Sequence, residues 1–182
     1  NFPGLPGIQY FKNQQVLGTP ENWNESIRRA RGTWIKLMHD GDWFADEYSL
    51  QKFYKATKAH PNCSFFFSAY NNVFDTNRKS ETVRLSNIGH FMLRRSVLNL
   101  FKKQYVGNPS CTLIKRYIGL YYDNNFKWVV DFEYYMRVLK TIKTFFYIDQ
   151  VLVNVGVNED QVTKYTFSNP DVEIPENNLL IE

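Results

Sequence analysis

Two aspartates, Asp40 and Asp42, follow a short apolar segment and are separated by Gly41. Two carboxylates on one turn can converge on a hard cation such as Mg²⁺ or Mn²⁺, which can in turn bridge phosphate oxygens. Gly41 allows the backbone to bend sharply and to approach a ligand closely. The alternative is an ordinary Asp-Gly turn with solvated carboxylates. The tripeptide alone favours this alternative, because such turns are common.

A third carboxylate, Asp131, follows Trp128-Val129-Val130 and begins the segment with the clearest helical periodicity. A carboxylate at a helix N-terminus accepts backbone N–H bonds and interacts favourably with the helix dipole, and both effects keep it ionised. An ionised carboxylate beside a bound hydroxyl can act as a general base. The alternative is an aspartate that only caps the helix, and the residue taken alone favours that alternative.

A turn, Gly107-Asn108-Pro109-Ser110, precedes a group of aromatic residues, Tyr117, Tyr121, Tyr122 and Trp128. Aromatic faces can pack against sugar rings, and Asn and Ser side chains hydrogen-bond hydroxyl groups. A turn followed by ordinary core residues explains the same pattern equally well.

The elements that must position these residues follow from hydrophobic periodicity and from turn residues. The predicted helices are residues 21–31, 46–59 and 131–143, with a short helix over 96–103. The predicted strands are residues 7–11, 34–38, 63–70, 111–114 and 145–157. Strands that alternate with helices indicate an α/β layer fold, in which ligands bind beyond the carboxyl ends of the strands. Asp40 and Asp42 are expected at such an end.

Three local details complete this prediction. Residues 71–81 are polar and indicate a loop or an edge hairpin. On the helix 131–143, Glu133 and Arg137 stand four residues apart, which predicts an ion pair on an exposed face. The segment after residue 167 is polar and contains Pro170 and Pro175, so we expect residues 168–182 to be a loosely held tail.

The composition indicates one globular domain. The 182 residues are 43% hydrophobic and 17% aromatic, which excludes a disordered chain. The net charge of +4 comes without a basic run, so we expect no nucleic-acid partner. The mild positive charge suits an anionic membrane surface or phosphorylated substrates. No apolar run approaches the roughly 20 residues that cross a bilayer.

The cysteines and histidines suggest no metal site. Cys63 and Cys111 lie in apolar segments without metal-ligand spacing, which favours two buried free thiols in a reducing compartment. His39, His60 and His90 share no metal spacing either, and we expect all three to be structural.

The order of these motifs resembles that of bacterial family-2 glycosyltransferases. The resemblance covers roughly residues 8–163. It is carried by Asn22-Trp23-Asn24-Glu25-Ser26-Ile27, Ala30-Arg31-Gly32-Thr33-Trp34-Ile35-Lys36, His39-Asp40-Gly41-Asp42-Trp43-Phe44, Gly107-Asn108-Pro109-Ser110, Lys127-Trp128-Val129-Val130-Asp131-Phe132-Glu133-Tyr134-Tyr135-Met136-Arg137 and Gly156-Val157-Asn158-Glu159-Asp160-Gln161-Val162-Thr163.

The resemblance implies a GT-A-like (Rossmann-like) three-layer α/β sandwich with a mixed, mostly parallel sheet. It implies that residues 1–167 form a single catalytic domain. The family's opening β-α-β-α portion, which makes most contacts to the nucleotide base, has no counterpart here. We therefore expect a truncated version of the fold, which as a fragment is not expected to be active alone.

The resemblance also implies an activity, namely inverting transfer of a sugar from a nucleoside diphosphate-sugar donor to an acceptor hydroxyl. The acceptor would be a glycan or a lipid-linked sugar, as in the synthesis of surface polysaccharide. Such an enzyme would be cytoplasmic, in peripheral association with the inner face of the membrane. The sequence does not indicate the sugar, the nucleotide or the oligomeric state.

The resemblance assigns roles to individual residues. Asp131 would be the general base, and Asp40 and Asp42 would hold Mn²⁺ or Mg²⁺ on the diphosphate. Trp43, Gly107, Asn108 and Trp128 would lie near the donor or the acceptor. Gly41 separates two aspartates that many relatives have side by side, and Asn158 stands where many relatives place a metal-binding histidine. An asparagine binds a cation only through its neutral carbonyl oxygen, which implies a weaker site.

Two other functions fit parts of the same pattern. The first is a non-catalytic carbohydrate-binding or assembly domain that retains the fold without the metal. The second is a metal-dependent phosphohydrolase that uses Asp40 and Asp42, although the sequence offers no further ligand set with suitable spacing.

Overall fold

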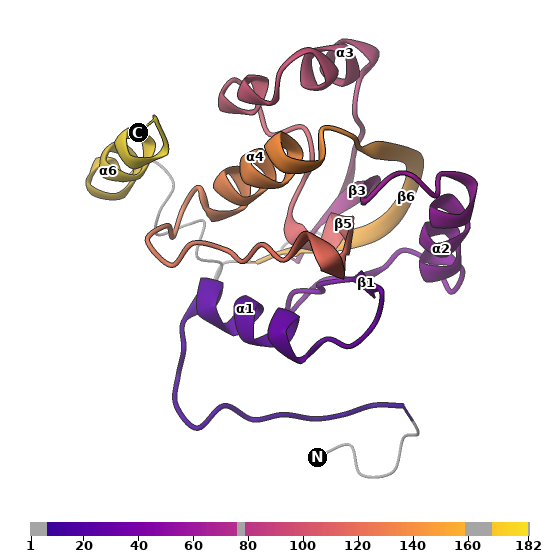
Figure 1. Cartoon of the computed structure of the whole chain (residues 1–182), viewed down its shortest axis with the longest axis horizontal. Helices are drawn as coiled ribbons and strands as arrows, with labels where there is room; N and C mark the ends of the chain where they lie inside the picture. Colours follow the sequence, from indigo (N-terminus) through magenta and orange to yellow (C-terminus); the bar gives the residue numbers. More distant parts are fainter. Residues whose placement is uncertain (1–6, 76–78, 159–168, 182) are drawn as a thin grey trace.

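The computed structural model describes residues 7–75, 79–158 and 169–181, which form a curled mixed sheet with helices on both faces (Figure 1). The strands are β1 (Trp34–Ile35), β2 (Trp43–Phe44), β3 (Phe65–Phe74), β4 (Ser80–Val83), β5 (Thr112–Lys115) and β6 (Phe146–Val157). The α-helices are α1 (Thr19–Arg29), α2 (Ser49–Ala59), α3 (Asn87–Arg95), α4 (Val130–Ile142) and α6 (Pro170–Ile181). Short 3₁₀ helices are η1 (Val97–Phe101), η2 (Pro109–Cys111) and η3 (Arg116–Ile118).

The sheet has the strand order β1-β5-β3-β6-β2, with β4 paired to β3. Of the five pairings among the described residues, only β3 with β6 is parallel, and the other four are antiparallel. The sheet is mixed as predicted, but the expectation that it is mostly parallel is wrong. Periodicity reveals strands and helices, whereas strand direction is decided by which strands become neighbours, and distant segments pair here.

The sheet has a separate hydrophobic core on each face, and strand β3 contributes to both. Phe65 and Phe67 belong to the core under α4, where Phe65 meets Tyr135 with ring centroids 5.7 Å apart. Phe66 points to the opposite face and packs in the core that contains Phe53 of α2. This alternation confirms the three-layer α/β arrangement, because a strand covered on both faces reads as a continuous apolar run.

Helix α4 agrees closely with its prediction, since the apolar stripe of residues 131–143 corresponds to Val130–Ile142. It ends where Lys143 takes a left-handed conformation with φ of 58°. The predicted pair of Glu133 and Arg137 exists, but its expected exposure is wrong. Glu133 is buried and receives both a guanidinium Nε–H and an Nη–H of Arg137.

The N-terminal segment and β1 differ from the prediction. Residues 7–11 form no strand, and Ile8, Tyr10 and Phe11 are exposed. An extended segment becomes a strand only where a neighbour pairs its backbone and covers its side chains. For the same reason the predicted strand 34–38 is reduced to β1, because only Trp34 and Ile35 find partners on β5. In the polar stretch 71–81, the described residues 71–74 and 80–81 belong to β3 and β4, which pair antiparallel, as expected for an edge hairpin.

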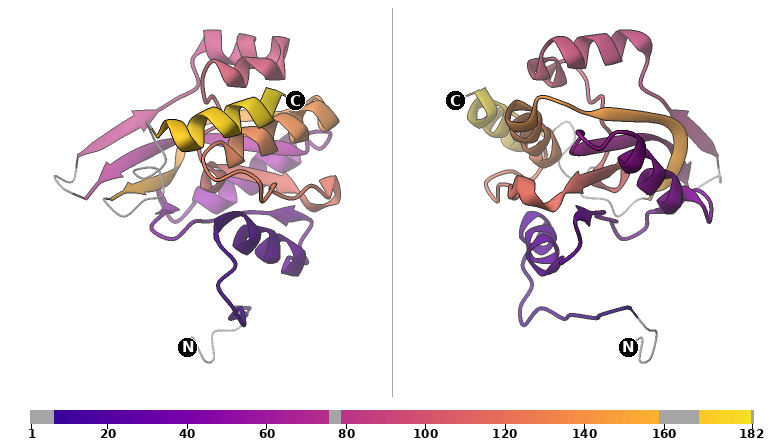
Figure 2. Two further views of the ribbon diagram at one scale, coloured as in Figure 1. Left: turned by 90° about the vertical axis from the view of Figure 1, so that its left-hand side faces the viewer. Right: turned by 45° about the vertical axis from the view of Figure 1, so that its right-hand side comes forward.

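The C-terminal segment is a helix, not the loosely held tail expected from its prolines. Pro170 occupies the start of α6, where a missing N–H costs nothing, and the Asn169 side chain accepts a hydrogen bond from the Asp171 N–H. Glu176 is buried and binds the segment that leads into α4, so α6 lies beside α4 (Figure 2).

The cysteines and the lengths of the helices were also open to prediction from the sequence. Cys63 and Cys111 are buried free thiols, as expected. Within residues 7–75, 79–158 and 169–181, the structure contains no helix with the length and apolar character needed to cross a membrane.

Candidate active site

The carboxylate of Asp42 is half-buried where three separate segments meet. One oxygen, Oδ2, accepts a hydrogen bond from Asn108 Nδ2 at 3.0 Å. The other, Oδ1, accepts one from the backbone N–H of Gly156 at 3.2 Å. The turn of residues 40–41, the loop before η2 and the end of β6 are therefore joined through this one side chain.

Two glycines allow the turn and β6 to approach this closely. Gly41 has φ of 83°, a left-handed conformation that favours glycine. A Cβ on Gly156 would lie 2.4 Å from the carbonyl oxygen of Gly41, so no side chain fits at position 156. The lack of a Cβ on Gly156 is thus what lets its N–H reach Asp42.

Burial dominates the electrostatics around Asp42. Desolvation raises its pKa, although hydrogen bonds from Ser110 and Asn108 and from the Gly156 N–H oppose this rise. Nearby, burial lowers the pKa of Lys36 to about 8, and its ammonium group donates to the Ser110 carbonyl oxygen. The Lys36 ammonium group and the Asp42 carboxylate are therefore both desolvated and interact with each other.

His39 immediately precedes the acidic turn and is structural, as predicted. Its ring stacks on Trp23 with centroids 4.3 Å apart, and its N–H backbone group donates to Ser110 Oγ. Burial lowers its pKa to about 4, so the ring is neutral near pH 7.

The other predicted metal ligands are not drawn into this junction. Asp40 and Asn158 are exposed, and neither side chain forms a hydrogen bond or an ion pair with the described residues. Within the described part of the chain, no three His, Cys, Asp or Glu side chains form a group that could hold a metal ion. The predicted closing segment over residues 159–163 lies outside the described residues.

Asp131 lies in the first turn of α4 and is half-buried. It accepts hydrogen bonds from Gln104 Nε2 at 3.1 Å and from the Phe132 N–H at 3.0 Å. Desolvation nevertheless raises its pKa to about 6, because burial outweighs these hydrogen bonds. The sequence prediction considered only the N–H bonds and the dipole, which act in the opposite direction. A carboxyl with a pKa of about 6 is mostly ionised at pH 7 and accepts a proton readily.

Residues 104–108 connect the two carboxylates. Gln104 donates to Asp131 through its side chain, and its Oε1 accepts from the Val106 N–H. Gly107 has φ of 89°, and a Cβ there would lie 2.7 Å from the ring of Tyr70. Asn108 then reaches Asp42. A single short loop thus places one donor on Asp131 and another on Asp42.

The remaining predicted binding residues occupy different positions. Trp43 on β2 is 45% exposed, and its strand pairs with β6. Trp128 is half-buried, and its backbone N–H donates to Glu176. Tyr122 stacks on Tyr134 inside the core with centroids 4.0 Å apart, which supports the structural interpretation of that tyrosine.

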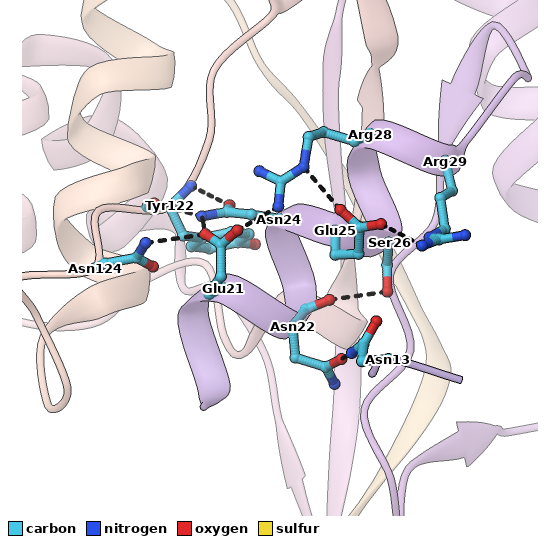
Figure 3. A network of polar contacts seen from close by, with 10 residues as sticks. All are labelled: Asn13, Glu21, Asn22, Asn24, Glu25, Ser26, Arg28, Arg29, Tyr122 and Asn124. Carbon is cyan, nitrogen blue, oxygen red and sulfur yellow. Dashed lines mark hydrogen bonds and ion pairs between the residues drawn. The ribbon is translucent and has the colours of Figure 1, made fainter. Parts of the chain in front are cut away.

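The approach to α4 depends on residues that the sequence analysis did not single out. Glu176 accepts hydrogen bonds from the N–H groups of Lys127, Trp128 and Val129. The buried side chain of Asn24 forms two 2.8 Å hydrogen bonds with the backbone of Tyr122, donating to its carbonyl oxygen and accepting from its N–H (Figure 3). Helix α1 therefore holds the loop that precedes Asp131.

Replacement of Asn24 by Ala is expected to lower the free energy of unfolding by about 2–3 kcal/mol, because it leaves both polar backbone groups of Tyr122 without partners in a buried place. Chemical denaturation measures the loss. The matched control is Asn22→Ala on the same helix, where the Asn22 side chain is exposed and accepts a hydrogen bond from the Asn13 amide. Equal stabilities of the two variants would contradict this role for Asn24.

Gln104 and Gly156 also escaped the sequence analysis as site residues. An isolated glycine within a strand pattern indicates a close approach of two backbones, and that signal was present at Gly156. No such signal marked Gln104, because its role depends on Asp131, which is distant in sequence.

A family model described as "Glycosyl transferase family 2" matches residues 2–119, which is more than half of the chain. The matched range contains Asp40, Asp42, Gly107 and Asn108, whereas Asp131 lies beyond it. A search of curated proteins finds no match to the chain.

Proposed function

The chain belongs to glycosyl transferase family 2, and from this premise we propose that it transfers a sugar from a nucleoside diphosphate-sugar to an acceptor hydroxyl with inversion. Membership in the family establishes a glycosyltransferase with a GT-A-like α/β fold. The observation that supports the finer proposal is the loop of residues 104–108, which contacts a desolvated base candidate, Asp131, and the acidic-turn residue Asp42.

In the proposed reaction Asp131 removes the proton of the acceptor hydroxyl. The acceptor oxygen forms a bond to the anomeric carbon while the bond from that carbon to the diphosphate oxygen breaks, and the electron pair leaves with the nucleoside diphosphate. Attack from the face opposite the leaving group inverts the anomeric centre. The pKa of about 6 at Asp131 suits this task, because a general base works best with a pKa near the working pH.

We propose that the acidic turn binds one divalent cation. Asp42 Oδ2 accepts a hydrogen bond from Asn108 and Oδ1 accepts one from the Gly156 N–H, and Ser110 also bonds to this carboxylate. Two carboxylate oxygens together have about four acceptor sites, so these bonds leave room for a cation. Mg²⁺ and similar ions typically bind one or two protein carboxylates and complete their coordination with substrate phosphates and water. Asp42 would be the protein carboxylate that holds such a cation, and Asp40 and Asn158, which are exposed and outside the Asp42 junction, are the proposed additional ligands. When bound, the cation would stabilise the charge that develops on the leaving diphosphate.

We also propose a role for each of three residues near these carboxylates. Because the Asn108 amide donates to Asp42, we assign Asn108 to the positioning of that carboxylate. The exposed Trp43 is proposed to provide a face for the donor, and Trp128, two residues before α4, is proposed to contact the acceptor. The acceptor that we propose is a glycan or a lipid-linked sugar of a surface polysaccharide pathway, and the proposed place of action is the cytoplasmic face of the membrane.

The proposal is tested by titration calorimetry of the full-length protein with Mn²⁺, in the presence of UDP or of GDP. We expect nucleotide binding that requires Mn²⁺ and that falls at least about 10-fold in Asp42→Asn, which removes a charged ligand. The control is Asp149→Asn, an exposed carboxylate paired with Arg84. Metal-independent binding, or none at all, would favour the alternative of a non-catalytic carbohydrate-binding or assembly domain.

A further inference from the structure

The surface formed by α3 and η1, residues 87–103, combines apolar and cationic residues and contains no acidic residue. No acidic residue occurs between Thr82 and Tyr122. The exposed residues of this surface are Asn87, Ile88, Phe91, Arg94, Arg95, Leu98, Phe101, Lys102 and Lys103. Eight of these nine residues are thus either large and apolar or cationic, and none of the four cations forms an ion pair within the described part of the chain.

The exposed apolar side chains are large and held in place. Ile88 is 76% exposed, and Phe91 and Leu98 are each 62% exposed. The opposite face of α3 packs tightly, because a Cβ on Gly89 would lie 2.9 Å from both Leu85 and Tyr105. Helix α3 lies at one end of the molecule, beyond the sheet (Figures 1 and 2). This surface is therefore fixed in orientation and projects from the domain.

A cationic hollow lies beside this surface, between the C-terminal ends of α3 and α4. It has a volume of about 480 Å³, and its lining includes Arg94, Arg95, Lys140 and Lys143. None of these four side chains forms an ion pair with the described residues. The Arg94 guanidinium lies 5.8 Å from the centre of the Phe145 ring, which forms part of the apolar wall. Four cations without acidic partners suit a phosphate group.

We propose that the α3–η1 surface binds an anionic lipid bilayer, with its apolar side chains in the headgroup region and its cations on lipid phosphates. Amphipathic helices that lie in the membrane interface combine Lys and Arg with Phe and Leu in this way. Basic residues near an anionic leaflet are attracted to it over about one Debye length. A protein partner that is merely acidic would leave four large apolar side chains without an apolar counterpart.

The biological role of this membrane binding rests on the proposed function, because binding would bring the enzyme to a lipid-linked acceptor. The binding itself is a property of residues 87–103, 140 and 143, and it requires no catalysis. Asp131 takes no part in it. A variant without the base is therefore expected to bind membranes as well as the unmodified protein does.

Co-sedimentation of the full-length protein with vesicles tests the proposal. We expect binding to phosphatidylcholine vesicles that contain phosphatidylglycerol, little binding to phosphatidylcholine alone, and weakening by salt. Arg94→Gln combined with Arg95→Gln should lower binding at least about 10-fold. Phe91→Ser combined with Leu98→Ser should lower it at high salt as well, because the apolar contribution is not screened.

The matched control is Lys55→Gln with Lys58→Gln, which removes the same charge from α2. It should bind like the unmodified protein, and circular dichroism verifies that every variant is folded. Failure to bind anionic vesicles, or equal losses in the α2 and α3 variants, would overturn the proposal. Asp131→Asn separates the two hypotheses, because it should bind vesicles without transferring sugar. If the unmodified protein binds vesicles but Asp131→Asn retains transfer, the assignment of the base fails and the membrane proposal stands. If the unmodified protein transfers sugar but does not bind anionic vesicles, the membrane proposal fails and the proposed activity stands.

Discussion

Replacement of Asp131 by Asn is expected to reduce sugar transfer about 10³-fold, because a positioned general base contributes 10²- to 10⁴-fold to such a reaction. The affinity for the donor should change little, since the carboxylate acts on the acceptor hydroxyl alone. A transfer assay and nucleotide calorimetry on the same preparation measure both quantities. The pH profile of kcat/KM in the unmodified enzyme should rise through about pH 6 as Asp131 ionises.

The same variant has a predictable effect on stability. The native pKa of about 6 lies above the value of about 3.9 in an unfolded chain, so the native state binds more protons between these values. Stability therefore falls as the pH rises from about 4 to about 6, and the burial of the ionised group costs about 3 kcal/mol above that range. Asp131→Asn lacks this loss, and thermal unfolding across the range should show the difference.

The matched control is Asp171→Asn, which changes a carboxylate in the first turn of α6 that is exposed. It should leave both the transfer rate and the pH dependence of stability nearly unchanged. If Asp131→Asn retained substantial transfer, Asp131 would not be the base. If its stability followed the same pH dependence as that of the unmodified protein, the pKa of Asp131 would not be raised in the folded state.

Replacement of Gly156 by Ala is expected to destabilise the protein by about 2–3 kcal/mol and to abolish metal-dependent nucleotide binding. The new Cβ would overlap the Gly41 carbonyl oxygen at 2.4 Å, and a backbone atom cannot rotate away as a side chain does. Separation of the two backbones also breaks the hydrogen bond from the Gly156 N–H to Asp42. Thermal unfolding and calorimetry with Mn²⁺ and UDP or GDP measure the two effects.

Val157→Ala on the same strand provides the comparison, because it removes atoms next to Gly156 and adds none. It should lose about 1 kcal/mol at most and keep the nucleotide site. Full stability and unchanged binding in Gly156→Ala would show that the turn can move aside. The contact between Gly41 and Gly156 would then not be what positions Asp42.

The α3–η1 surface could be predicted from the sequence only in part. The acid-free stretch from Thr82 to Tyr122 is readable in the sequence, but the surface is not, because burial decides which apolar residues remain exposed. Leu93 and Leu100 are buried, whereas Ile88 and Phe91 of the same segment are exposed. The sequence likewise does not show that Lys140 and Lys143 line the same hollow as Arg94 and Arg95, because the two pairs are about 45 residues apart in the chain.

The sequence by itself determined what depends on neighbours along the chain. The periodicity of α4, the continuous apolar run of β3, the free thiols and the acidic turn were predictable because each is a local pattern of side chains. The family resemblance rests on the order of such patterns, and the match over residues 2–119 confirms the family.

Only the tertiary structure decided what depends on partners distant in sequence. Strand directions, the helix at the C-terminus and the absence of a strand at residues 7–11 all follow from which segments meet. The raised pKa of Asp131 and the anchoring of Asp42 by Asn108 and Gly156 arise in the same way. Desolvation and hydrogen bonding are properties of a side chain's surroundings, and a linear pattern does not specify those surroundings until the chain has folded.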